Sequence, residues 1–449
     1  MKKCSLLLLG ILALLVACDE EPPVSADMRL IEAINSVAGI DGNSEFIFPD
    51  SDDFTNIPQD PLNPLSPAKV QLGKLLFHET ALAIDGNFTE TTNTYSCASC
   101  HHAQGGFQAN LPQGIGDGGM GFGMNGEGRT FNPLVVKEDI DVQPIRTPTA
   151  LNSAFQTNML WNGQFGATGV NVGTESVWPD EGPISTNNLG YEGLEIQAIA
   201  GLSVHRFGLS ISEDFITGTE YKELFDVAFF DLPEEERYNK ETAGLAIAAY
   251  ERTLFAHEAP FQQWLKGDFN AMTEDQTQGA VIFFRENCVS CHNGPALASM
   301  TFHGFGFNDL FNGSYGTGEV INVADDNPAA LGRGSFTKDP ADNYKFKTPQ
   351  LYNLKDSKFF GHGSSFTDLE ALIRYKTSGV AENPVVPASQ LSSEFTNRNL
   401  TDREIEQLAD FIENALYDPN LLRYVPTALP SGNCFPNNDA LSRVDLECL

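Results

Sequence analysis

Two copies of one short motif constrain this chain most: Cys97-Ala-Ser-Cys100-His101 and Cys288-Val-Ser-Cys291-His292. C-x-x-C-H is the attachment signal for c-type haem, in which both thiols form thioethers with the porphyrin and the adjacent imidazole binds the iron. Neither motif has a second C-x-x-C or an H-x₃₋₅-H beside it, as a zinc site would need. The sequence therefore predicts two covalently bound haem c groups, attached through Cys97, Cys100, Cys288 and Cys291, with His101 and His292 as iron ligands.

The N-terminus has the layout of an export signal. Met1-Lys2-Lys3 precedes an apolar run over residues 6–16 that is too short to span a membrane. The run ends in Leu15-Val16-Ala17-Cys18, which resembles a bacterial lipobox and implies cleavage before Cys18 and lipidation of that cysteine. A plain secretory signal is the alternative. We expect a protein of the periplasm or cell envelope, held to a membrane by lipid alone.

Two cysteines are left once the signal and the motifs are assigned. Cys434 and Cys448 flank a polar C-terminal stretch and could form a local disulfide, because disulfides persist in an oxidising compartment. Two free thiols are the alternative.

The formal net charge of −33 argues against a nucleic-acid partner and against electrostatic binding to anionic lipid. It favours a basic redox partner, although solubility alone explains an acidic surface equally well.

A chain of 449 residues is long enough for two domains of ordinary size, and each half carries one motif. We expect a lipoprotein signal peptide, a tether with an irregular N-terminal arm, two haem domains and a C-terminal tail. Their boundaries are 1–18, 19–60, 61–260, 261–425 and 426–449.

Helical signals dominate and strand-like alternation is scarce, so we predict a mainly α fold. Ser66-Pro67 is an N-cap with a first-turn proline. Capping boxes at Thr273/Gln276 and Thr401/Glu404 begin two later helices, the last ending near residue 416. Apolar spacing predicts helices over 68–77, 242–255 and 369–375. The glycine-rich run 114–128 is expected to be a surface or haem-edge loop.

Further segments, in order, resemble landmarks of the bacterial di-haem cytochrome c peroxidase family. They lie at residues 72–77, 146–155, 161–163, 182–184, 249–254, 288–295, 331–333 and 346–349. The resemblance implies two cytochrome c-like haem domains packed with long irregular loops. It also implies that electrons enter at the C-terminal haem and that peroxide reacts at the N-terminal one. Trp161 would lie between the haems as the electron conduit.

The sixth ligand of the first haem is not fixed by the sequence. No histidine occurs between His102 and His205, and His102 adjoins the proximal ligand and cannot swing across the ring. We expect an open position, which Met120 or Met124 could close.

The second haem lacks the methionine that the resemblance implies, because no methionine follows Met300. Strict alignment with the position of the family's methionine favours Lys376 as the sixth ligand. Tyr375 would resemble the related di-haem enzymes that mature a tryptophan-derived quinone cofactor. His362 and His303 are further alternatives.

This sequence departs from the family pattern at two more positions. Family members bind calcium through an Asn before the Thr-Pro-Thr segment, so the resemblance implies one calcium ion. That position is Arg146 here, and a positive charge is a poor neighbour for the ion. The acid/base candidate is Glu192, for which we expect a raised pKa in a partly apolar haem pocket. Glu195 or Glu181 could replace it, and an exposed helix-cap glutamate is the alternative.

The function implied is reduction of hydrogen peroxide to water with electrons from a small cytochrome c or cupredoxin. A di-haem oxidase that modifies a protein side chain is the second enzymatic version. A non-catalytic di-haem electron carrier is the third alternative. A homodimer is also expected.

Overall fold

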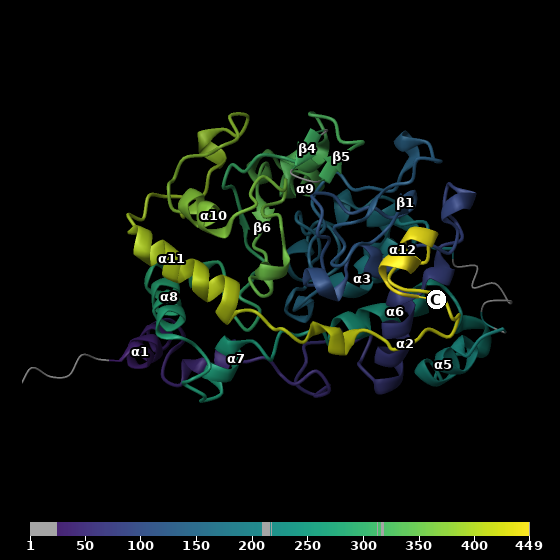
Figure 1. The fold of residues 1–449 in the computed structure, drawn as a ribbon, viewed down its shortest axis with the longest axis horizontal. Coiled ribbons are helices and arrows are strands. Elements are labelled where there is room, and N and C mark those ends of the chain that lie inside the picture. The colour runs from purple at the N-terminus through teal and green to yellow at the C-terminus, as the bar shows by residue number, and fades with distance from the viewer. Residues whose placement is uncertain (1–24, 209–215, 217, 312, 316–317, 449) are drawn as a thin grey trace, which may run out of the picture.

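The computed structural model describes residues 25–208, 216, 218–311, 313–315 and 318–448 (Figure 1). The helices are α1 (Ala26–Ala38), α2 (Pro67–His78), α3 (Gly193–Val204), α5 (Tyr221–Ala228), α6 (Lys240–Glu251), α7 (Pro260–Leu265), α8 (Glu274–Arg285), α9 (Arg333–Thr337), α10 (Leu369–Lys376), α11 (Asp402–Asp410) and α12 (Ala440–Asp445). Long irregular segments connect them, so the mainly α prediction is confirmed.

The strands are short and form three antiparallel pairs. They are β1 (Gly119–Met120) with β2 (Thr130–Phe131), β3 (Phe302–His303) with β6 (Phe346–Lys347), and β4 (Gly313–Tyr315) with β5 (Gly318–Val320). The expected signal peptide with Cys18 lies outside the described residues. Within the described ranges, no helix has the length and apolar character needed to cross a bilayer.

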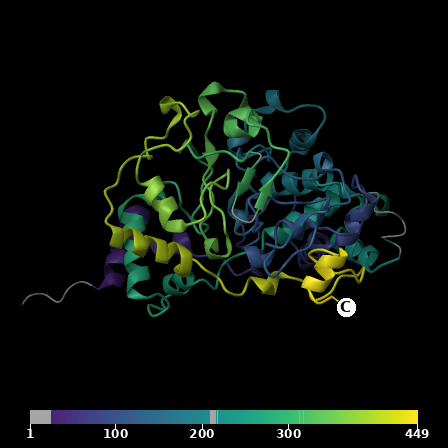
Figure 2. The same cartoon turned by 45° about the horizontal axis from the view of Figure 1, so that its top comes forward.

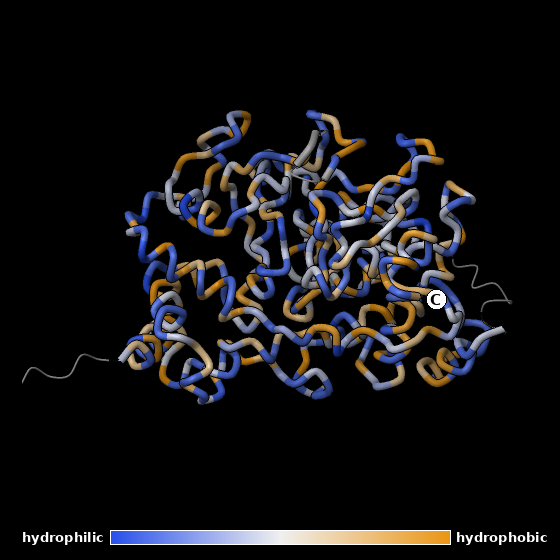
Figure 3. The backbone as a smooth tube through the Cα atoms, in the orientation of Figure 1, coloured by the Kyte–Doolittle hydropathy of each residue, from blue (hydrophilic) through white to orange (hydrophobic). Residues whose placement is uncertain are grey.

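Two helix pairs repeat one arrangement. α2 precedes the first motif and packs on α6, and α8 precedes the second motif and packs on α11. Each crossing is made at a glycine. A Cβ on Gly73 would lie 1.8 Å from the carbonyl oxygen of Ala246, and one on Gly279 would lie 2.0 Å from that of Gln407. Only glycine allows this approach. One continuous hydrophobic core joins both pairs, and Figure 3 shows hydrophobic stretches in helices at both ends of the molecule.

The predicted helix starts are confirmed. The Ser66 hydroxyl accepts from the Lys69 backbone N–H at 3.2 Å, and both capping boxes form. α11 continues as a π-helical turn, Phe411–Ala415, close to its expected end. α6 ends four residues earlier than predicted, because the chain after it pairs with Asn152. The Asn152 N–H donates to the carbonyl of Leu254 at 2.8 Å, and its side chain accepts from the Ala256 N–H at 3.1 Å.

The N-terminal arm is not irregular throughout, as we had expected for residues 19–60. α1 lies within it and packs on α8 through Leu30 and Ile34, which are fully buried. The Ser25 side chain caps the helix, and Asp27 accepts a hydrogen bond from the Trp264 indole at 2.9 Å. The polar composition of the arm concealed this short apolar face.

The glycine-rich run 114–128 is mostly buried, so the surface alternative is wrong and the haem-edge alternative fits. A Cβ on Gly114 would lie 3.1 Å from the Cys100 sulfur. Arg129 stabilises the loop from inside by donating to the carbonyls of Ile115 and Gly116 at 2.6 and 2.8 Å. Met124 is 81% exposed.

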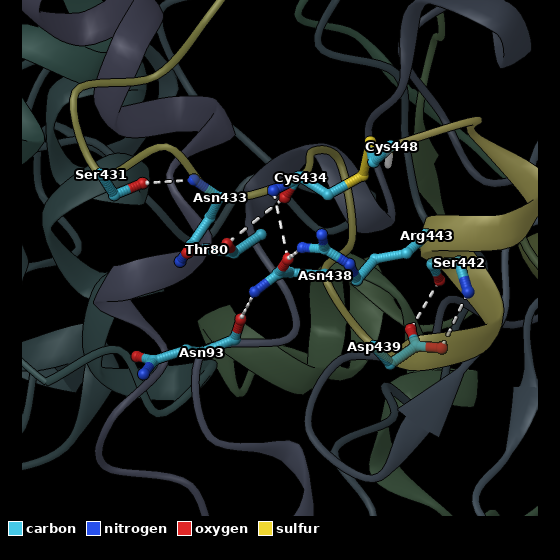
Figure 4. The surroundings of a disulfide bond; sticks show 10 residues. All are labelled: Thr80, Asn93, Ser431, Asn433, Cys434, Asn438, Asp439, Ser442, Arg443 and Cys448. Carbon is cyan, nitrogen blue, oxygen red and sulfur yellow. Dashed lines mark hydrogen bonds between the residues drawn. A yellow bond between two sulfur atoms is a disulfide. The ribbon is translucent and has the colours of Figure 1, made fainter.

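The C-terminal segment runs from the α8–α11 end of the molecule to the first motif (Figures 1 and 2). The Ser96 hydroxyl donates to the carbonyl of Pro436 at 2.8 Å, and the buried Ser99 hydroxyl bonds to Asn437. A disulfide joins Cys434 to Cys448, as predicted, and secures this segment with α12 (Figure 4).

Replacing either crossing glycine by alanine should separate its helix pair. We expect Gly73→Ala and Gly279→Ala each to lower the free energy of unfolding by about 1–3 kcal/mol, as overpacked cores do. The measurement is urea unfolding of the haem-loaded protein, followed by circular dichroism. The control is Gly201→Ala in α3, where a Cβ would meet only the Gln197 side chain, at 3.5 Å. Helix propensity should make that variant more stable by about 0.8–1 kcal/mol. Equal effects at all three positions would contradict the tight-crossing interpretation.

Candidate functional site

Both C-x-x-C-H motifs begin with the same tight turn. Cys97–Ser99 and Cys288–Ser290 are 3₁₀ turns, and the next histidine N–H returns to the first cysteine carbonyl, at 3.1 Å for His101 and 3.0 Å for His292. None of the four motif cysteines takes part in a disulfide. These turns therefore place two unpaired thiols and one imidazole on each site, which is the donor set that covalent haem requires.

Backbone carbonyls orient both imidazoles. Nδ1 of His101 lies 3.3 Å from the Phe107 carbonyl oxygen, and Nδ1 of His292 lies 3.1 Å from each of those of Leu297 and Pro349. Burial lowers the pKa of His101 to about 4. Burial, and next the charge of Lys376, lower the pKa of His292 to about 3. Both rings are therefore neutral with Nδ1–H donating, which leaves Nε2 for a metal. The residues present fit a haem at each motif.

A Thr-Pro segment follows each motif at the same structural place. Residues 146–149 read Arg-Thr-Pro-Thr and residues 347–350 read Lys-Thr-Pro-Gln. The Pro349 carbonyl lies 3.1 Å from Nδ1 of His292, and the Pro148 carbonyl lies near His101 and raises the pKa of that ring.

An asparagine in the left-handed region then follows each Thr-Pro segment. Asn152 has φ 58° and Asn353 has φ 54°. Each donates its backbone N–H to the end of the second helix of its pair, Asn152 to Leu254 at 2.8 Å and Asn353 to Leu416 at 3.1 Å. Helix, motif, Thr-Pro segment, asparagine and helix thus recur in the same order in both halves.

A large cavity lies beside the second motif. Its wall includes Cys288, Cys291 and His292, and extends to Arg146, Trp161 and Lys347 near the first half of the chain. Much of the remaining wall is apolar and includes Phe305, Phe307, Phe346, Leu369 and Ile373. We call this space the second-motif cavity. Its apolar wall and its position fit a porphyrin face.

The two neighbouring candidates on α10 point in different directions. The Tyr375 hydroxyl lies 2.6 and 2.8 Å from the carbonyl oxygens of Phe305 and Gly306 and accepts from the Glu382 N–H at 3.1 Å. Tyr375 does not line the second-motif cavity, but Lys376 does. The Lys376 amine lies 4.8 Å from the centroid of the Phe305 ring, and burial lowers its pKa.

The two alternative histidines also line this cavity, but their ring nitrogens are engaged. His303 has Nδ1 at 3.1 Å from the Ser392 hydroxyl and Nε2 at 2.8 Å from that of Thr301. His362 has Nε2 at 2.9 Å from Asp309, and its ring stacks on Phe346 with a centroid separation of 3.5 Å. These contacts make both weaker candidates than Lys376.

Trp161 is fixed between the two Thr-Pro segments. Its indole N–H donates to the Arg146 carbonyl at 2.9 Å, and its own carbonyl accepts from the Lys347 N–H at 2.7 Å. The side chain also lines the second-motif cavity.

The three glutamates expected near residue 190 are in different environments. The guanidinium of Arg252, which is fully buried, donates to Glu195 at 2.7 and 2.9 Å and to Glu192 at 3.0 Å. Glu192 is the N-cap residue of α3 with a side chain 22% exposed, whereas Glu181 is exposed. Glu192 therefore belongs to a buried ion-pair cluster and is not a solvated helix cap. Its contact is a guanidinium and not the apolar pocket that we expected.

Glu251 was missed by the sequence analysis. It is buried at the end of α6, and its Oε2 has no hydrogen-bond partner among the described residues. Burial, and next the charge of Glu195, raise the pKa of Glu251 to about 8. Its charge in turn raises the pKa of the Cys97 thiol, after burial, so the carboxyl lies near the first motif. The available signal was its place next to Arg252 on a helix with little polar surface.

Arg146 and its neighbours do not fit a calcium ion. The Arg146 guanidinium is buried there and donates to Gln108 and Ser357 at 2.9 and 2.8 Å. Calcium requires six to eight oxygen ligands. Across the described ranges, no group of three or more His, Cys, Asp or Glu side chains could hold a metal ion.

The repeated motif setting defines a c-type cytochrome with two attachment sites. Residues 67–270 match the family model for di-haem cytochrome c peroxidase. Over this stretch the chain is similar to the di-haem cytochrome c peroxidase family. Members of this family carry two c-type haems.

Curated relatives match over most of their length. The chain is 28% identical to the methylamine utilization protein MauG of Methylorubrum extorquens over 367 residues, covering 81% of this chain and 82% of that one. It is 25% identical to the cytochrome c551 peroxidase of Nitrosomonas europaea over 387 residues, covering 85% and 91%. A crystal structure of a MauG-like protein associated with microbial copper homeostasis shares the fold, with a TM-score of 0.57, 21% identity and coverage of 84% and 96%.

The raised pKa of Glu251 predicts a pH-dependent stability. A folded-state pKa of about 8, above the ordinary value of 4.5, contributes stability that is complete below pH 4.5 and is lost as the pH rises through 8. Between these limits the free energy of unfolding should fall by up to about 1.4 kcal/mol per pH unit. Glu251→Gln should abolish this dependence, measured by urea unfolding of the haem-loaded protein at pH 5.5, 7 and 8.5.

Glu90→Gln, at an exposed carboxylate, is the matched control and should keep the wild-type profile. Parallel profiles for the wild type and the Glu251 variant would contradict a buried protonated carboxyl.

Proposed function

We propose that this protein is a di-haem c-type peroxidase that reduces hydrogen peroxide to water. Electrons from a small redox protein enter at the C-terminal haem and are used at the N-terminal haem. The proposal depends on the position of Trp161. Hydrogen bonds hold this residue between the two segments that lie beside the proximal histidines. When bound, haem iron with an open position supplies the redox chemistry with peroxide.

We infer that the chain forms two cytochrome c-like haem domains, at 61–260 and 261–425, with a C-terminal tail at 426–449. The repeated order of helix, motif, Thr-Pro segment and helix supports this division. His101 and His292 are the proximal ligands in the proposal, because both present a neutral ring with Nδ1 already bonded to carbonyls.

The proton-transfer groups that we propose are Glu192 and Glu251. The Arg252 guanidinium donates to the Glu192 carboxylate at 3.0 Å and so orients that group. Glu251, with its pKa raised to about 8, holds a proton at neutral pH. A pair with one oriented carboxylate and one protonated carboxyl is suited to move a proton between the oxygens of peroxide.

We propose Lys376 as the sixth ligand of the second haem, in preference to Tyr375. Three observations favour it: the lysine lines the second-motif cavity, its charge acts on His292, and the tyrosine hydroxyl is engaged elsewhere. The lowered pKa of the amine favours the neutral form that binds a metal.

A second enzymatic function, oxidation of a protein side chain, is the alternative. The similarity to MauG and the lack of any methionine after residue 300 favour it. A non-catalytic electron carrier is a weaker alternative, because the Glu192–Arg252–Glu195 cluster would then have no chemical task.

We further infer export to the periplasm or cell envelope, with lipid attachment at Cys18. The donor would be a small cytochrome c or cupredoxin, and the net charge of −33 favours one with a basic surface. Homodimer formation stays a prediction.

The test of the peroxidase proposal is oxidation of a reduced small cytochrome c by hydrogen peroxide with the haem-loaded protein as catalyst. We expect turnover in the wild type and at least a tenfold loss in Trp161→Phe with unchanged haem content. Trp178→Phe is the matched control, because that indole makes only a local bond to Thr174 at 3.1 Å. Absence of turnover in the wild type, with no spectral change on peroxide addition, would leave the carrier alternative. Turnover only with a protein substrate would favour the oxidase.

Lys376 and Tyr375 are distinguished by spectroscopy of the ferric protein. Lys376→Ala should remove one low-spin signal in electron paramagnetic resonance and raise the high-spin signal. Tyr375→Phe, which alters the neighbouring residue on the same helix, should leave the spectrum unchanged. The reverse pattern would assign the ligand to Tyr375.

A further inference from the structure

Two buried cations line the second-motif cavity without an acidic partner. Arg146 and Lys347 both belong to its wall, and both are more than nine-tenths buried. In the described part of the chain, neither side chain forms an ion pair with a carboxylate. A protein interior rarely holds a charge in this way, because an unpaired buried ion is costly.

Arg146 has hydrogen-bond capacity left over. Its two terminal nitrogens donate to neutral partners, Gln108 and Ser357, at 2.9 and 2.8 Å. Its Nε is buried and has no partner in the described residues. A guanidinium has five N–H donors in a fork that matches a carboxylate. Burial lowers the pKa of Arg146 to about 10, and no neighbouring acid opposes this shift.

Lys347 has the same character in the second half. Its amine bonds to the Gln156 side chain and to the Asn158 carbonyl, the latter at 2.8 Å, and both partners are neutral. An ammonium has three donors, so one remains. Burial alone lowers the pKa of Lys347 to about 7.

The internal repeat places the two cations at equivalent positions. Each stands two residues before the proline whose carbonyl bonds a motif histidine, Pro148 for Arg146 and Pro349 for Lys347. Each also contacts Trp161 through its backbone, Arg146 by its carbonyl and Lys347 by its N–H. Both residues therefore lie next to Trp161 in the wall of the cavity.

Among the described residues, one carboxylate lines this cavity, and it has a partner other than Arg146 or Lys347. Glu394 lies 3.8 Å from His303, on the strand that follows the second motif. The negative charge that Arg146 and Lys347 require therefore has to arrive with the cavity's occupant. Haem carries two carboxylate side chains, and thioether attachment leaves both of them free.

We propose that Arg146 and Lys347 bind the carboxylate side chains of the haem attached at Cys288 and Cys291. They hold that edge of the haem against Trp161. The proposal rests on haem attachment at the second motif and does not depend on peroxide being the substrate. Arg146 and Lys347 act as positioning residues, because they set the place and the charge of the haem and do not touch a reacting atom.

Removing either positive charge should lower the reduction potential of the second haem, because uncompensated carboxylates stabilise ferric iron. The variants are Arg146→Gln and Lys347→Gln, and the measurement is spectroelectrochemical titration of both haems in the haem-loaded protein. We expect one of the two midpoint potentials to fall by at least 59 mV, which is a tenfold change in the ratio of oxidised to reduced haem. Haem content is measured in parallel by the pyridine haemochrome assay.

Two further variants serve as controls for charge and for position. Arg146→Lys retains the charge and should retain most of the potential. Arg333→Gln removes another buried guanidinium, which bonds to Asn171 at 2.8 Å outside this cavity, and should leave both potentials unchanged. If Arg146→Gln yields no haem-loaded protein, Lys347→Gln carries the test.

The proposal is overturned if both glutamine variants bind two haems with unchanged potentials, or if Arg146→Lys shifts the potential as far as Arg146→Gln does. Absence of peroxidase turnover in the wild type, together with the expected shift in potential in the variants, would leave the carboxylate contact in place and contradict only the proposed function.

Discussion

The hydrogen bond from each motif histidine to a distant backbone carbonyl is the constraint on which the rest of the structure depends. An imidazole can bind iron through Nε2 only if Nδ1–H is satisfied elsewhere, and proline carbonyls from the two Thr-Pro segments lie beside the two rings. These segments are anchored by Asn152 and Asn353 to the ends of their crossing helices. The helix crossing, the ring orientation and the place of Trp161 are therefore set together.

The regular elements were predictable because their signals are local. The cap at Ser66, the two capping boxes and the disulfide between Cys434 and Cys448 each depend on side chains within a short span of sequence. The misses concern contacts with remote chain. α1 gains its stability by packing on α8, and the burial of the glycine-rich run follows from Arg129, whose guanidinium satisfies carbonyls that composition alone assigns to solvent.

In the candidate site, too, local features could be predicted from the sequence and contacts with remote residues could not. Covalent chemistry at the motifs follows from spacing, so those six residues could be named from the sequence. The direction of a side chain cannot be read in this way. Tyr375 and Lys376 are adjacent on one helix, and the contact of the phenol with the Phe305–Gly306 backbone shows which of the two lines the cavity. Glu251 could not be identified from the sequence for a related reason. Its raised pKa follows from burial, and its Oε2 has no hydrogen-bond partner among the described residues.

The last residues of the chain cover its first attachment site. Ala98 and Ser99 are buried, and Pro436 and Asn437 bond to the serines of that turn. The C-terminal segment therefore serves as a cover for the turn between Cys97 and Cys100, although it is remote from that turn in sequence. The Cys434–Cys448 bond closes the cover on itself, so the first attachment turn and the end of the chain form one structural unit.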